Sequence, residues 1–203
     1  MTALSVSVDG KELVTVAISD VTMLCVGLVG QRWEDALATL DMNGGDYAGT
    51  DSEPYRTWIN RIRLEPGQVV TVACVADTPT SHAGKTFAEL FPDEPRCERT
   101  DFTPTAAEFD EMNSRPMLRD GYAFKLTTSQ GIEYSAQTEA GEYGFALRIM
   151  WTSLHRPECA RFSVSTNTVE QMQTRTPARE HVKGELFLGQ SLRFEVWPNT
   201  PNV

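Results

Sequence analysis

Residues 64–72 read Leu-Glu-Pro-Gly-Gln-Val-Val-Thr-Val, and residues 186–194 read Leu-Phe-Leu-Gly-Gln-Ser-Leu-Arg-Phe. Both stretches share Leu-x-x-Gly-Gln followed by alternating apolar residues, and they lie 122 residues apart. Glycine at that point indicates a tight turn, and apolar residues at every second position indicate a β-strand with one buried face. A turn and a strand that recur together predict an internal duplication of the chain.

The apolar runs upstream of the two turns recur in the same order and at nearly the same spacing. The offset grows from 120 to 122 along the halves, and the matched pairs are Leu4 with Phe124, Leu24 with Phe145, and Leu40 with Phe162. The alternative is that two unrelated β segments share a generic alternation of apolar residues. The shared Leu-x-x-Gly-Gln turn favours duplication over that alternative.

The strand pattern divides the chain into three parts. Apolar runs of strand length occupy residues 1–76 and resume over residues 120–203, whereas residues 77–119 contain five of the eleven prolines and lose the alternation. We therefore predict a mainly β protein of two similar tandem domains, each a β-sandwich or an open barrel. The residues between them predict an acidic, irregular linker with short helices near 85–91 and 105–113.

The closing element of each half also resembles known proteins. The hairpin signal at residues 9–10, Trp58 and residues 64–72 resemble a family of small, uncharacterised bacterial β proteins. Gln68 stands where that family has an acidic residue. The resemblance covers the first 76 residues, and the second half only loosely. It implies a small β fold and carries no activity with it.

The charge of the chain limits the partners that it can bind. Its 28 acidic and 18 basic residues give a formal net charge of −10, which repels nucleic-acid phosphates and anionic lipid. We expect no nucleic-acid partner and no membrane partner, and we expect a protein partner to be basic. The longest apolar stretch, residues 21–29, is too short to cross a bilayer, and no signal peptide is recognised, so a cytoplasmic location is expected.

No segment carries a complete signature of catalysis or of phosphate binding. Gly84-Lys85-Thr86 matches the end of a phosphate-binding loop, but Pro79 stands where that loop needs its first glycine. Only three histidines are present, which reduces the supply of general bases. The sequence therefore predicts no catalytic residue and no cofactor, while an enzyme with a site between the halves is left open.

Metal ligands and cysteines are present without the spacings of known motifs. Carboxylates surround the turn at residues 43–45, but the twelfth-position glutamate of a calcium loop is missing. His82, His155, Cys97 and Cys159 lack the paired spacing of a zinc site, and we predict no bound metal.

The four cysteines fall into two groups. Cys25 and Cys74 lie in apolar strand-like runs and are expected to be reduced thiols in the core. Cys97 and Cys159 lie in polar segments that contain proline, and they are expected to be more exposed. A disulfide between these two is disfavoured by the expected cytoplasmic location.

The function classes that remain follow from the acidic charge and the lack of a catalytic motif. The first is a non-enzymatic protein-binding module, such as an immunity protein or an inhibitor with an acidic docking surface. The alternatives are a carbohydrate- or small-ligand-binding β module and a structural component of a virion or secretion assembly. The predicted partner-contact residues are Trp33, Asp46, Asp51, Glu53, Glu108 and Glu111. The alternative for the tryptophan is a packed core or interface residue.

Overall fold

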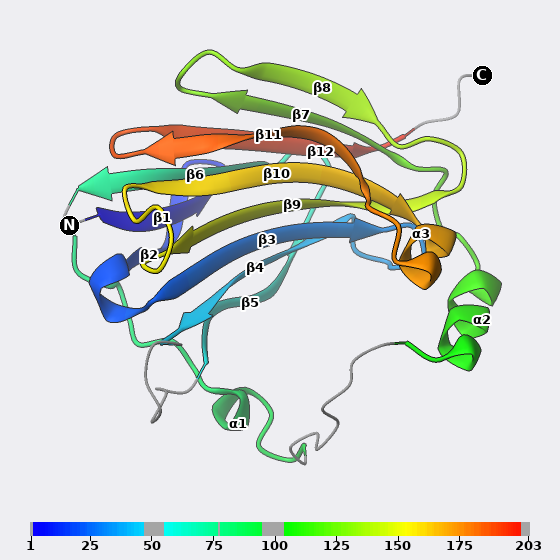
Figure 1. The fold of residues 1–203 in the computed structure, drawn as a ribbon, viewed down its shortest axis with the longest axis horizontal. Coiled ribbons are helices and arrows are strands. Elements are labelled where there is room, and N and C mark those ends of the chain that lie inside the picture. The colour runs from blue at the N-terminus through cyan, green and yellow to red at the C-terminus, as the bar shows by residue number, and fades with distance from the viewer. Residues whose placement is uncertain (1, 47–54, 77, 95–103, 200–203) are drawn as a thin grey trace.

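The computed structural model describes residues 2–46, 55–76, 78–94 and 104–199 of the 203-residue chain (Figure 1). Two six-stranded antiparallel sheets stack face to face, and they do not close into a barrel. This architecture confirms the predicted mainly β fold with two similar halves.

Each sheet takes three strands from each half. Sheet A has the order β2-β1-β6-β12-β7-β8, with β1 (Thr2–Val8), β2 (Lys11–Ala17), β6 (Val69–Ala76), β7 (Tyr122–Thr128), β8 (Glu133–Gln137) and β12 (Ser191–Pro198). Sheet B has the order β11-β10-β9-β3-β4-β5, with β3 (Met23–Gln31), β4 (Ala38–Gly45), β5 (Arg56–Leu64), β9 (Glu142–Thr152), β10 (Cys159–Thr168) and β11 (Arg179–Phe187). The outermost strands of the sandwich are therefore β2 and β5 in the first half, and β8 and β11 in the second.

The two halves meet along the centre of sheet A in a register that repeats itself. Val70 pairs with Phe194, and Val72 pairs with Leu192, across β6 and β12. At the offset of 122, Val70 corresponds to Leu192 and Phe194 corresponds to Val72, so each pair is the counterpart of the other. The halves are thus related by an approximate two-fold axis, as in a symmetric dimer interface, but within one chain.

The same relation holds in sheet B at an offset of 121. Leu24 pairs with Trp151, and Gly30 pairs with Phe145, across β3 and β9. Buried side chains of both halves form one continuous hydrophobic core. Trp151 is 4 % exposed within it, as the alternation of its strand predicts.

The Leu-x-x-Gly-Gln motif has the same local structure in both halves. Gly67 and Gly189 take φ values of 86° and 81°, which favour glycine. The side-chain oxygen of Gln68 accepts the N–H of Glu65 at 2.9 Å, and Gln190 closes the second turn in the same way at 2.7 Å. Glycine allows the positive φ of the turn, and the glutamine side chain closes the turn with a hydrogen bond. These two roles account for the Gly-Gln pair that both halves share.

Among the described residues, three short helices and one 3-10 turn lie outside the sheets: η1 (Ile18–Asp20), α1 (Phe87–Leu90), α2 (Ala106–Ser114) and α3 (Val169–Thr174). The helices α1 and α2 confirm those expected near 85–91 and 105–113. All three α-helices begin at a threonine whose hydroxyl accepts an N–H of the first turn. No helix in the described part of the chain is long and apolar enough to span a membrane.

The cysteines depart in part from expectation. Cys74 is buried as predicted, and burial raises the pKa of its thiol to about 11. Cys25 is only half-buried. Cys159 is 4 % exposed, contrary to the exposure expected from its polar neighbours, because it opens β10 and pairs there with Phe187. Cys97 lies outside the described residues.

Candidate functional site

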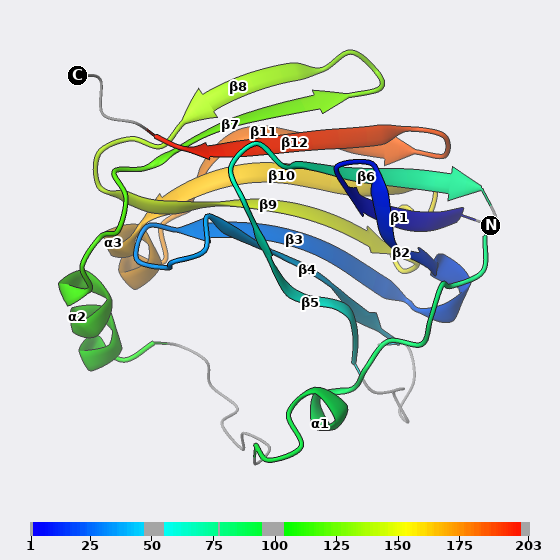
Figure 2. The same cartoon turned by 180° about the vertical axis from the view of Figure 1, so that it is seen from behind.

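The linker closes one side of the sandwich in the first half. Residues 80–85, which we call the strap, run from the edge of β2 to the edge of β5 (Figure 2). Ser81 donates its N–H to Thr15 O at 2.9 Å and accepts the Thr15 N–H on its hydroxyl at 3.0 Å. The Thr80 hydroxyl accepts the N–H of Ala17 at 2.9 Å. The strap thereby satisfies outward-facing backbone groups of an edge strand.

The far end of the strap pairs with β5. Lys85 and Thr57 exchange two backbone hydrogen bonds of 2.8 and 2.9 Å. The Arg56 guanidinium donates to the Gly84 carbonyl at 3.2 Å, and the Trp58 indole donates to another strap carbonyl at 3.2 Å. A Cβ at Gly84 would lie 2.9 Å from the Arg56 Cβ, so the strap packs tightly on the strand.

The corresponding edge of the second half has no strap among the described residues. Thr138 donates its N–H to Tyr122 O at 2.9 Å at the end of the β7–β8 hairpin. Because hydrogen-bonded pairs alternate along an antiparallel ladder, the odd-numbered residues of β8 point their backbone groups away from β7. Ser135 is one of them and is the counterpart of Thr15, but no described residue takes the place of Ser81.

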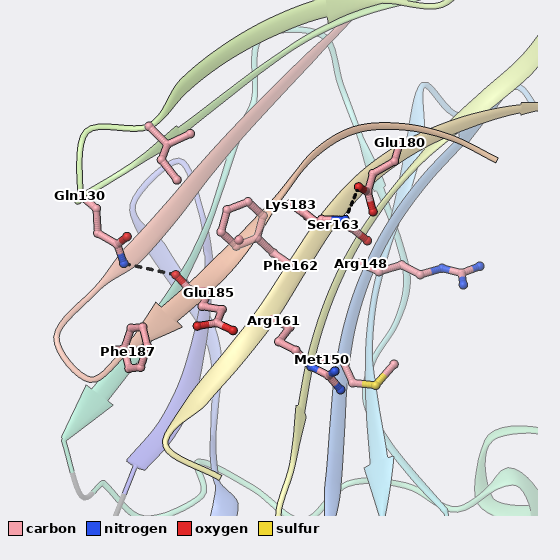
Figure 3. A pocket seen from close by; sticks show the side chains of 12 residues that line it. Gln130, Arg148, Met150, Arg161, Phe162, Ser163, Glu180, Lys183, Glu185 and Phe187 are labelled. Atoms are coloured by element: carbon pink, nitrogen blue, oxygen red, sulfur yellow. Dashed lines mark hydrogen bonds and ion pairs between the residues drawn. The ribbon is translucent and has the colours of Figure 1, made fainter. Parts of the chain in front are cut away.

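Side chains bridge the gap that the strap fills in the first half. The bonds between the two edges join Tyr134 to His181 at 3.2 Å, Arg179 to Gln137 O at 3.3 Å, and Gln130 to Glu185 O at 3.2 Å (Figure 3 shows the last). These contacts leave the outward N–H and C=O of Ser135 unpaired within the described residues.

A buried polar network lies behind these bridges. Glu142 is 5 % exposed and accepts both Nε and Nη2 of Arg179 at 2.9 Å. The fully buried Thr166 hydroxyl donates to Glu142 and lies 2.9 Å from Nε2 of His181. Side chains from β9, β10 and β11 thus satisfy one another, as buried polar groups require.

The first half is largely apolar at the same positions. The counterparts of Glu142, Thr166 and His181 are Val21, Gly44 and Trp58. The counterpart of Arg179 is Arg56, which donates to a carbonyl of the strap. The offset is 122 at the end of β5 and 123 before Arg61, which has a φ of 48° and lies where this strand contains one extra residue.

Contacts within the network set the protonation of its members. Burial acts to raise the pKa of Glu142, but hydrogen bonds from Thr166, the Glu139 N–H and Arg179 outweigh it and hold that pKa below its ordinary value. Burial, helped by the charge of Arg179, lowers the pKa of His181 against the opposing effect of the two carboxylates. At neutral pH the site therefore combines an ionised glutamate with a neutral imidazole.

A hollow of about 830 Å³ lies beside β11, and we call it the edge hollow (Figure 3). Its lining combines side chains of both charges with apolar ones, including Arg148, Arg161, Glu180, Glu185, Met150 and Phe187. Lys183 is paired with Glu180 at 2.8 Å. The volume lies within the range of ligand-binding pockets.

Gly184 helps to form the edge hollow. A Cβ at this position would lie 2.6 Å from Cζ of the buried Phe162, so no side chain can cover the hollow there. The pair Leu40 and Ile62 occupies the same register in the first half, where the smaller leucine leaves room for the isoleucine. The second half thus has a larger core residue, Phe162, and no side chain on the edge strand at Gly184.

The turn next to the edge hollow exposes apolar side chains. Phe187 is 37 % exposed and Leu188 is 55 % exposed. Glu65 and Pro66 occupy the same two positions of the turn in the first half. At this turn the second half therefore places two exposed apolar residues beside a hollow, where the first half has Glu65 and Pro66.

The predicted partner-contact residues are distributed over two ends of the molecule. Trp33, Glu108 and Glu111 lie near α2, whereas Asp46 follows β4 at the opposite end of the β3–β4 ladder. Asp51 and Glu53 lie outside the described residues.

Trp33 is half-buried in this end of the molecule. Its ring stacks on Tyr143 with centroids 4.8 Å apart, its indole donates to Gln31 at 2.8 Å, and Arg115 lies over it at 5.9 Å. Glu111 pairs with Arg115 at 2.7 Å. The packed environment of the tryptophan agrees with the alternative of an interface aromatic residue.

Comparison with other proteins provides no relative. The chain matches no protein-family model, and no curated protein or solved structure matches it. Within the described residues, no three His, Cys, Asp or Glu side chains are placed to hold a metal ion. The site must therefore be interpreted from its own geometry.

Proposed function

We propose that the protein is a non-enzymatic protein-binding module and that its contact surface is the edge of the second half. This surface comprises the edge hollow and the turn at Phe187 and Leu188. The observation that carries the proposal is the contrast with the first half, where Glu65 and Pro66 stand at the same turn. Exposed apolar side chains beside a hollow with a charged rim are typical of protein-binding surfaces.

Two further features support this surface. The buried network of Glu142, Thr166, His181 and Arg179 fixes the strands on which the surface is built, and fully satisfied polar networks rigidify their surroundings. The net charge of −10 favours a basic partner through electrostatic steering. An immunity protein or an inhibitor of a basic enzyme is the class that this combination favours.

Site-specific photo-crosslinking tests the surface directly. A photoreactive residue is placed at Leu188 in one variant and at Pro66 in its matched control, and both are irradiated in lysate of the native host. We expect one protein to be crosslinked from the first position and not from the second. A Phe187→Glu/Leu188→Pro variant, which copies the first-half turn, should lose that partner. Equal products from both positions would contradict the proposal.

A small-ligand-binding module is the second candidate, and the size of the edge hollow favours it. A thermal-shift screen of sugars and small metabolites distinguishes the two. This second function would be favoured by a compound that raises the melting temperature of the wild-type protein but not that of an Arg161→Ala variant.

A further inference from the structure

The strap shows what the edge of this sandwich can bind. It bends at Ser81 and His82, it contacts an outward-facing residue of the sheet A edge, and it ends in a β-bridge on the sheet B edge. Its contact with β2 uses both the backbone and the hydroxyl of Ser81, together with the hydroxyl of Thr80.

The second half presents the same backbone acceptors and donors. Leu126 pairs with Tyr134 across β7 and β8 as Val6 pairs with Val14 across β1 and β2. The backbone N–H and C=O of Ser135 therefore point away from the sheet, as those of Thr15 do. Glu180 on β11 is the counterpart of Thr57, the residue on which the strap ends. The bond between Tyr134 and His181 occupies the space between the two edges, so an incoming chain would contact Ser135 along the outer edge of β8.

The charge along this edge differs from that in the first half. Glu133 precedes Ser135 and is exposed, and no described cation pairs with it. Exposed carboxylates of Glu139 and Glu180 lie at the other end, each with one cationic neighbour already bound. A segment with positive charge is therefore complementary to this edge.

We propose that the free edge of β8 binds an extended, positively charged, Ser- or Thr-containing segment of a partner protein, as the strap binds β2. This mode of docking rests on the protein-binding function proposed above. The incoming segment donates a backbone N–H to the Ser135 carbonyl and accepts the Ser135 N–H on a hydroxyl, which is the pattern by which Ser81 contacts Thr15.

A peptide with the sequence of residues 78–86 is the probe, because it contains Thr80, Ser81 and Lys85 and reproduces the strap. It is titrated into the intact ¹⁵N-labelled protein while backbone amides are followed by NMR. We expect the Ser135 amide to shift and the Thr15 amide to stay unchanged. A control peptide with proline in place of Ser81 lacks the donating N–H and should bind roughly tenfold more weakly.

Two protein variants locate the binding edge. Ser135→Pro removes an outward N–H at an edge position where proline is tolerated, and it should weaken the peptide at least about tenfold. Glu133→Lys should weaken it at low salt, whereas Glu65→Lys, an exposed carboxylate on the first-half turn, should not. The wild-type titration stands without either variant if one of them fails to fold.

Three results would overturn binding at the edge of β8. The peptide could fail to bind, it could shift Thr15 by displacing the strap, or Ser135 could shift with protein concentration alone, which would indicate pairing of two copies. None of these results removes a partner crosslinked at Leu188, so failure of this docking mode is distinguishable from failure of the binding function.

Discussion

The two halves of this protein share a fold but close the same edge of the sandwich by different means. In the first half a segment of the linker pairs with Thr15 and Thr57, and the positions behind it are Val21, Gly44 and Trp58. In the second half, side chains span the gap and a buried network lies behind them. A duplicated scaffold thus provides an internal control, in which a strap covers one edge and no described segment covers the other.

The largest effect is expected where the second half has placed charge in the interior. Glu142→Val introduces the first-half residue, and it removes the buried carboxylate to which both Arg179 and Thr166 donate. We expect it to lower the free energy of unfolding by about 3 kcal/mol in denaturant titrations. Glu139→Val removes an exposed carboxylate from the same arginine and should cost less than about 1 kcal/mol. Equal decreases in the free energy of unfolding would show that the buried carboxylate contributes no more to stability than the exposed one.

The next largest loss of stability is expected from side chains added at Gly184, beside the edge hollow. Gly184→Ala places a Cβ against the ring of Phe162 and should destabilise the protein by about 1–3 kcal/mol. The double variant Phe162→Leu/Gly184→Ile restores the first-half pair Leu40 and Ile62. Its melting temperature should lie above that of Gly184→Ala. If the double variant is the less stable of the two, the halves do not pack equivalently at this register.

The strap should contribute a smaller amount, and only in the first half. Ser81→Ala removes the hydroxyl that accepts the Thr15 N–H and should cost about 1 kcal/mol. Ser135→Ala alters the exposed counterpart of Thr15, where no described group depends on the hydroxyl, and should stay within about 0.5 kcal/mol of wild type. Chemical denaturation of both variants in parallel provides the comparison, and a reversed order would contradict it.

The smallest effect is expected from pH. The folded-state pKa of His181 lies below the unfolded value of about 6.5, so the unfolded chain binds the proton first as pH falls. Stability should therefore be complete above that pH and decline below it. His181→Gln should flatten this decline between about pH 7 and about pH 5, measured by thermal unfolding. Glu142, whose pKa is lowered, remains ionised in this window and does not contribute. An unchanged slope would exclude His181 as its source.

The sequence predicted those parts of the fold that local patterns determine. The strands, the helices α1 and α2, and the offsets between the halves depend on alternation, capping residues and the Gly-Gln turn, all of which are local. The pairing of β6 with β12 and of β3 with β9 was not predicted, because it joins residues far apart in the chain. The halves therefore share their sheets and one core, and we expect them to unfold in a single transition.

The network and the edge hollow were missed for the same physical reason. Glu142, Thr166 and His181 are single polar residues in three different strands, and none is unusual in its own segment. A signal was nonetheless present in the alignment of the halves, where Val21 aligns with Glu142. Positions where a duplicated sequence changes from apolar to charged indicate where one copy has acquired a new contact.

Amide hydrogen exchange in the free protein tests the central contrast between the two edges most directly. The N–H of Thr15 is bonded to the strap, whereas the N–H of Ser135 has no partner among the described residues. At low protein concentration we predict slow exchange at Thr15 and rapid exchange at Ser135. Comparable protection at both amides would show that the edge of the second half is already occupied, and it would contradict the account of β8 as a free docking edge.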